Sequence, residues 1–133
     1  MSVPPLSILL VEADRDTRED RCADLEERGC VVTPAATPAE GLEAIVLGRF
    51  DVVVSDLLRR SRGGLWLWRE ATALRPELRR RFVFCGSGPV FDRDEVLEQE
   101  SFLITPVSPA TLWRAVLLAV HGPQLQNHRS SSA

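Results

Sequence analysis

The stretch from Phe50 to Gly64, FDVVVSDLLRRSRGG, decides how the rest of the chain is arranged. Residues 52–54 form an unbroken run of valines, which is typical of a strand covered on both faces in a parallel sheet. Asp56 follows at the carboxyl end of this strand, where a carboxylate needs solvent, a hydrogen-bond donor or a cation. Ligands of open α/β sheets bind at this edge. Position alone leaves two interpretations of Asp56 open: a functional site, or a residue that caps the following loop.

Apolar runs and helical segments alternate along the whole chain. Strands are predicted at 6–11, 30–33, 52–56, 82–85 and 102–104, and helices at 15–28, 38–48, 65–74 and from 109 onward. Thr37 and Glu40 form a capping box with Pro38 at the first helical position. Residues 92–100 hold one short helix at most. Because parallel strands need crossover connections, this alternation predicts a doubly wound, five-stranded parallel sheet with helices on both faces.

Length and composition set further limits. The chain has 133 residues, 44% of them hydrophobic, which suits one domain over residues 1–122. We expect residues 123–133 to be a polar, disordered tail, with the last helix stopped at His121–Pro123. A net charge of −3 argues against nucleic-acid binding, and neither a signal peptide nor a membrane span is evident. Three cysteines without CxxC spacing favour reduced thiols and a cytoplasmic location.

The order of these motifs resembles the receiver domain of bacterial response regulators, over about residues 6–121. ILLVEAD resembles the first strand with its acidic pair, FDVVVSDLLRRSRGGL the strand with the phosphoacceptor aspartate, and LITPVSPATLWRAV the fifth strand and last helix. The resemblance implies a flavodoxin-like fold with a shortened fourth helix. It also implies a role in two-component or phosphorelay signal transduction. The sequence contains no motif typical of an enzyme, so we expect no enzymatic activity.

The resemblance carries over only in part at the site. Asp56 matches the phosphoacceptor, and Glu12, Asp14 and Asp56 are the candidate metal ligands. The chain departs from the family at three positions: Ala13 replaces the second acid, Gly86 the switch hydroxyl, and Thr105 the lysine, in a chain whose sixteen basic residues are all arginine. At a fourth position, Phe102 matches the switch aromatic. Arg59 or Arg60 is a candidate partner that supplies the missing cation to Asp56; the alternative is a solvated loop.

These departures favour a pseudo-receiver that works without phosphorylation, without a cofactor, and by binding a protein partner. The alternative is a receiver that is phosphorylated on Asp56 by a histidine kinase, with weakly bound Mg²⁺. The resemblance places the partner or homodimer surface on the last helix and fifth strand, where Trp113 and Leu117 are candidate anchors. Trp66 is a further candidate. Packing of either tryptophan into the core stays open as the other interpretation.

Overall fold

The structure, a computed structural model, describes residues 4–56, 63–86 and 100–132, with side chains as far as residue 122. Its elements follow one another in the order β1 (Ser7–Val11), α1 (Arg15–Glu27), β2 (Val31–Ala35), α2 (Pro38–Leu47), β3 (Val52–Asp56), α3 (Gly64–Leu74), the short 3₁₀ helix η1 (Pro76–Leu78), β4 (Phe82–Gly86), β5 (Ser101–Ile104) and α5 (Pro109–Ser132). The alternation predicted from the sequence is confirmed, with boundaries that differ by a residue or two except at the end of α5. The predicted short fourth helix falls in 87–99, outside the described residues.

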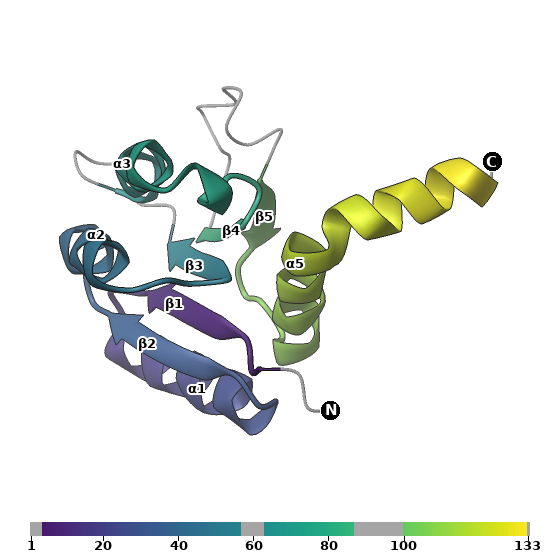
Figure 1. The fold of residues 1–133 in the computed structure, drawn as a ribbon. Helices are drawn as coiled ribbons and strands as arrows, with labels where there is room; N and C mark the ends of the chain where they lie inside the picture. Colours follow the sequence, from purple (N-terminus) through teal and green to yellow (C-terminus); the bar gives the residue numbers. More distant parts are fainter. Residues whose placement is uncertain (1–3, 57–62, 87–99, 133) are drawn as a thin grey trace.

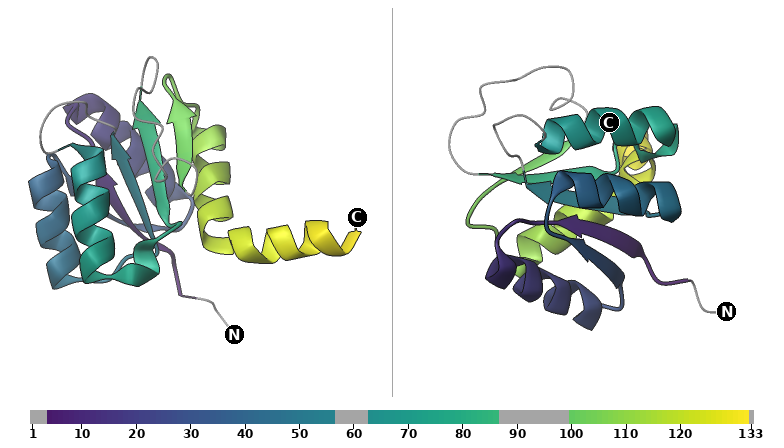
Figure 2. Two further views of the ribbon diagram at one scale, coloured as in Figure 1. Left: turned by 90° about the horizontal axis from the view of Figure 1, so that it is seen from above. Right: turned by 90° about the vertical axis from the view of Figure 1, so that its left-hand side faces the viewer.

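The five strands form one parallel sheet in the order β2-β1-β3-β4-β5. Helices α1 and α5 lie on one face of this sheet, and α2 and α3 lie on the other (Figure 1; Figure 2 gives two further views). All strands point the same way, so their carboxyl ends share one edge, as the sequence predicts. This arrangement brings the end of β1 next to the end of β3, where Val11 and Ser55 are paired in register.

Alternate residues of each central strand feed two separate hydrophobic clusters. Ile8, Leu10, Val52 and Val54 face the α1 and α5 side together with Leu25, Leu112 and Val116. Leu9, Val11 and Val53 face the other side, against Ile45, Leu67 and the rings of Phe82 and Phe84. The central valines are fully buried, which explains why β3 has no polar face. The acid at its end is therefore held on a rigid, two-sided core.

Local sequence signals explain where the helices begin. At α2, the Thr37 side chain accepts the Glu40 N–H, and the Glu40 carboxylate accepts the Thr37 N–H, each at 3.1 Å, so the predicted capping box is confirmed. At α5, the Ser108 hydroxyl accepts the Thr111 N–H at 3.1 Å.

The end of the last helix differs from the prediction. The expected stop at His121–Pro123 is wrong, because helical backbone continues to Ser132. Figure 1 shows α5 bending away from the sheet after the part that packs on it, so its C-terminal part projects outward. A proline inside a helix lacks the N–H that bonds to the previous turn, and its ring clashes with that turn, so the helix usually kinks there. A domain boundary at residue 122 stays a prediction.

Candidate functional site

The candidate site lies at the carboxyl ends of β1 and β3 and is built around Glu12 and Asp56. Glu12 follows β1 directly and is only 7% exposed, whereas Asp56 ends β3 and is half-buried. The Asp56 carboxylate Oδ2 accepts the backbone N–H of Ala13 at 3.1 Å. The structure thus brings together two of the three acids predicted as metal ligands.

The third predicted ligand, Asp14, has a different role. Its Oδ2 accepts the Thr17 N–H at 2.9 Å and the Thr17 hydroxyl at 2.6 Å, so its side chain caps the start of α1. These two hydrogen bonds lower the pKa of Asp14 and keep it ionised. Only its backbone N–H reaches toward the site, where it donates to Glu12 Oε2 at 3.1 Å.

An arginine on α1 forms an ion pair with Glu12. Arg21 Nη1 donates to Glu12 Oε1 at 3.0 Å, and the two side chains are 12% and 9% exposed. One turn earlier, Arg18 Nη1 donates to the Glu12 carbonyl oxygen at 2.8 Å. The Glu12 carboxylate is therefore fixed by an arginine and a backbone amide, which leaves it little freedom to bind a metal.

The carboxyl group of Asp56 has a raised pKa. Burial, followed by a hydrogen bond to the Glu12 side chain, raises the pKa of Asp56 to about 7. The Ala13 N–H and the Arg21 charge act in the opposite direction and do not cancel the effect. Two neighbouring carboxyl groups that share a proton explain this pattern, because both cannot ionise at low cost.

The residues present do not fit Mg²⁺. Within the described residues, no group of three histidine, cysteine or acidic side chains is arranged to hold a metal ion. Mg²⁺ needs ionised oxygen ligands, yet Glu12 is paired with Arg21, Asp56 has a raised pKa, and Asp14 caps a helix.

The remaining predicted positions surround this pair without completing it. Thr105, in place of the family lysine, donates its backbone N–H to the Gly86 carbonyl at 2.8 Å and precedes a cis peptide bond to Pro106. Gly86 ends β4, and Phe102 packs with the cluster between the sheet, α2 and α3. Arg59 and Arg60 lie outside the described residues, so their pairing with Asp56 stays a prediction.

A cleft of about 630 Å³ opens beside the acidic pair, between α1 and the start of α5. Glu12, Arg21 and Thr105 line it, together with Thr17, Asp20, Asp24, Pro106, Val107, Pro109 and Leu112. Asp56 is not among the lining residues. The Arg21–Glu12 ion pair therefore forms part of the wall of this groove.

Sequence reasoning missed Arg21, although a signal was present. Arg18, Arg21 and Leu25 recur at spacings of three and four, which places them on one face of a helix. Leu25 is fully buried, so this face of α1 points toward the sheet and its first two positions reach the site.

Both tryptophans predicted as interface anchors are partly buried. Trp113 packs against the cluster under α1 and α5, and the Arg28 guanidinium carbon lies 5.5 Å from its ring centroid. Trp66 packs against the cluster on the other face of the sheet. Leu117 is partly buried, and its neighbour Leu118 is 41% exposed. Core packing, the alternative left open by the sequence, thus accounts for much of both rings.

Comparison with known proteins agrees with the fold. No family model matches the sequence. The chain is 35% identical over 78 residues to the C4-dicarboxylate transport transcriptional regulatory protein DctD of Rhizobium meliloti, which covers 59% of this chain and 17% of that protein. It is 29% identical over 118 residues to the transcriptional regulatory protein GlrR of Escherichia coli, and this match covers 87% of this chain and 26% of that protein. The chain thus spans about a quarter or less of these relatives.

Solved structures extend the comparison. A CheY-like response regulator receiver domain from Methanospirillum hungatei superposes with a TM-score of 0.79 at 22% identity, over 92% of this chain and 98% of that one. A response regulator receiver protein from Sinorhizobium medicae superposes with a TM-score of 0.78 at 22% identity, over 90% of this chain and 98% of that one. In the described part of the chain, no helix is long and apolar enough to cross a membrane. By its strand order, layers and superposition, this chain has the flavodoxin-like fold of response-regulator receiver domains.

Proposed function

We propose that this chain is a receiver-like module of two-component signal transduction that works without phosphorylation and acts by binding a protein partner. The observation that carries the proposal is the Arg21–Glu12 ion pair, which stands at 3.0 Å inside the site. A receiver needs free carboxylates there to bind a divalent cation. In this chain, a carboxylate and a guanidinium from the same polypeptide already neutralise each other.

The charge at Asp56 supports the same proposal. A phosphoryl group on Asp56 would add negative charge beside Glu12, and the family lysine that would offset it is replaced by Thr105. A charge-assisted hydrogen bond of that kind contributes roughly 1.5–3 kcal/mol. The nearest described cation, Arg21, is already bonded to Glu12. We therefore propose neither a metal cofactor nor an enzymatic activity for this domain.

A phosphorylated receiver is the second candidate. One observation favours it: Asp56 stands half-buried at the end of β3, and its Oδ2 accepts a single backbone N–H among the described residues. Phosphorylation by a histidine kinase would then require Glu12 to break its bond to Arg21. This candidate keeps the phosphoacceptor role that the resemblance implies.

Intact-mass measurement after incubation with acetyl phosphate and Mg²⁺ separates the two. We expect no phosphoryl mass gain in the wild-type chain. A variant carrying Ala13→Asp and Thr105→Lys restores the two missing groups, and a gain in this variant would show that the assay works on this fold. A wild-type gain that disappears in Asp56→Asn would overturn the proposal and establish the phosphorylated receiver.

The proposed partner surface is the face formed by α5 and β5, in a cytoplasmic protein. Ile104 and Leu118 are 68% and 41% exposed there, and Leu117 is partly buried beside them. Exposed aliphatic side chains next to a helix suit a protein interface or a homodimer. Light scattering over a range of protein concentration tests the homodimer. A concentration-dependent dimer that Ile104→Ser with Leu118→Ser abolishes would identify this face, and a dimer indifferent to both would exclude it.

A further inference from the structure

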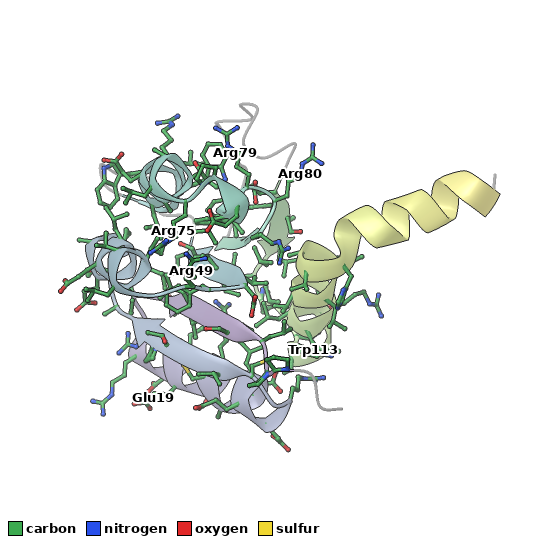
Figure 3. The ribbon with its side chains drawn as sticks, viewed as in Figure 1. Glu19, Arg49, Arg75, Arg79, Arg80 and Trp113 are labelled. Atoms are coloured by element: carbon green, nitrogen blue, oxygen red, sulfur yellow. The ribbon has the colours of Figure 1, made fainter. Side chains whose placement is uncertain are left out.

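The edge of the sheet opposite Asp56 carries a concentration of arginines that the receiver-like function does not explain. Five of them lie where the strands begin, on the segments that lead into β3 and β4. We call this set the basic rim; it consists of Arg49, Arg75, Arg79, Arg80 and Arg81. Figure 3 shows Arg79 and Arg80 pointing away from the body of the domain.

One of these arginines joins the ends of two helices. Arg75 Nε donates to the Ile45 carbonyl at 2.9 Å, and its Nη2 donates to the Val46 carbonyl at 3.4 Å. These carbonyls belong to the last turn of α2, which has no intrahelical donor for them. Arg75 therefore holds the C-terminal ends of α2 and α3 side by side, and it places the residues after both helices on one surface.

A buried carboxylate fixes the other arginines. Glu100, only 7% exposed, accepts the Arg80 N–H at 2.7 Å and the Phe82 N–H at 2.9 Å. Between them the backbone of Arg80 takes a φ of 67°, in the left-handed region that non-glycine residues seldom adopt. The carboxylate thus maintains the tight turn that carries Arg79, Arg80 and Arg81.

Apolar surface lies beside these charges. Leu47 is 80% exposed, and Val46 and Leu74 are each 56% exposed, at the helix ends that Arg75 joins. Next to them is a hollow of about 400 Å³, lined by Ser7, Arg49, Phe50, Asp51, Glu77 and Arg81. The exposed aliphatic side chains provide contacts for apolar side chains of a partner, whereas the hollow has a largely charged lining with one aromatic residue, Phe50.

The charge of this surface is opposite to that of the chain. Among the described residues, none of the five arginines forms an ion pair with an acidic side chain. The acids close to them are Asp51 and Glu77, besides Glu100, whose oxygens are used by backbone N–H groups. A local excess of unpaired guanidinium groups on a protein of net charge −3 is complementary to carboxylates.

We infer that the basic rim, with Val46, Leu47 and Leu74, binds an acidic protein segment that also carries aliphatic side chains. Guanidinium groups pair with its carboxylates, while the exposed Val46, Leu47 and Leu74 contact its apolar side chains. The surface lies at the opposite edge of the sheet from Asp56. The inference therefore does not depend on whether Asp56 is phosphorylated, and either proposal can fail without the other.

Fluorescence anisotropy with a labelled peptide of alternating Glu and Leu residues tests this inference. We expect saturable binding that weakens with salt, and loss of binding when the Glu residues are replaced by Gln or the Leu residues by Ser. The double variant Arg49→Gln with Arg79→Gln should weaken binding about two- to thirtyfold, because each of the two exposed ion pairs contributes ~0.2–1 kcal/mol. Leu47→Ser, at a largely exposed position, should weaken it without affecting folding.

A matched double variant separates local from overall charge. Arg15→Gln with Arg114→Gln removes the same charge from exposed positions on α1 and α5, and it should leave binding unchanged. Equal weakening by both double variants would overturn the inference, as would absence of peptide binding. Sedimentation with phosphatidylcholine–phosphatidylserine vesicles is the last arm. Vesicle binding that needs Arg49 and Arg79, without peptide binding, would replace the protein partner with an anionic membrane.

Discussion

Arg21 Nη1 lies 3.0 Å from Glu12 Oε1, and both side chains are almost removed from solvent, at 12% and 9% exposure. The pair joins α1 to the end of β1 and engages Glu12, one of the acids that the resemblance implies as metal ligands. Loss of this pair should cost more stability than loss of an exposed ion pair, because a buried Glu12 carboxylate without its arginine has no solvent to replace it.

Removal of the guanidinium should therefore destabilise the fold. Arg21→Gln leaves the buried Glu12 carboxylate without its cation, and we expect the free energy of unfolding to fall by about 2–4 kcal/mol. The matched control is Arg15→Gln, which breaks a pair with Glu19 whose side chains are 80% and 61% exposed and should cost less than about 0.5 kcal/mol. Urea unfolding measures both. Equal effects of the two variants would show that burial does not strengthen the Arg21 pair.

Asp56 should make stability depend on pH. Its pKa is raised from 3.8 to about 7, so between these values the folded chain holds a proton that the unfolded chain releases. The contribution to stability is complete below about pH 4 and is lost as the pH rises through 7. Asp56→Asn cannot ionise, so it removes this loss, and we expect it to stabilise the fold more at pH 8 than at pH 5, by about 1–3 kcal/mol.

Urea unfolding at both pH values checks this difference. Asp20→Asn, an exposed acid on α1, serves as the control and should give the same small change at both. A pH-independent effect of Asp56→Asn would mean that Asp56 is ionised in the folded chain at neutral pH.

Gly64 allows α3 to begin directly against the end of β3. A Cβ atom at this position would overlap the Asp56 carbonyl oxygen and lie 3.3 Å from Phe84 Cε1. Backbone cannot move aside as a flexible side chain can, so Gly64→Ala should destabilise by about 1–3 kcal/mol. Gly122→Ala is the control, since nothing lies within 4 Å of its added Cβ, and it should be neutral or stabilise α5 by up to about 1 kcal/mol. Thermal unfolding of both variants distinguishes the two sites.

The elements of the fold were predictable because their signals are local. The valine run of β3, the capping box at Thr37 and the proline at the start of α5 each act within a few residues, and each prediction is confirmed. The end of α5 was not predictable in this way, because Gly122–Pro123 is typical of a helix stop, whereas the helix bends and continues. A local signal therefore indicated an interruption but not whether the chain would leave the helix.

The candidate site was predictable only in part, since it depends on contacts between distant residues. The placement of Glu12 and Asp56 on one edge follows from strand order alone. Arg21 is nine residues from Glu12 and reaches it only after α1 docks on the sheet, so strand-end reasoning could not find it. The use of Asp14 as a helix cap had a local signal, Thr17 three residues later, but the resemblance directed attention to metal binding.

Glu100 should contribute to stability through the turn before β4. Its two carboxylate oxygens each accept one backbone N–H, and Gln has a single acceptor oxygen. Glu100→Gln therefore leaves one N–H facing an amide nitrogen, and we expect a loss of about 1–3 kcal/mol in urea unfolding. Glu77→Gln, exposed on the same edge, should change stability by less than about 0.5 kcal/mol. Matching values for both would show that the turn is held by other contacts.

Trp113 provides the last prediction, which separates a core role from an interface role. Its ring packs on the cluster under α1 and α5, beneath the Arg28 guanidinium. Trp113→Ala should therefore destabilise the chain by about 2–4 kcal/mol, whereas Leu118→Ala, 41% exposed on the same helix, should cost less than about 1 kcal/mol. Arg28→Gln should cost about 0.5–1 kcal/mol through the lost contact with the ring. Unchanged stability of Trp113→Ala, together with a changed molecular mass in light scattering, would instead identify Trp113 as an interface anchor.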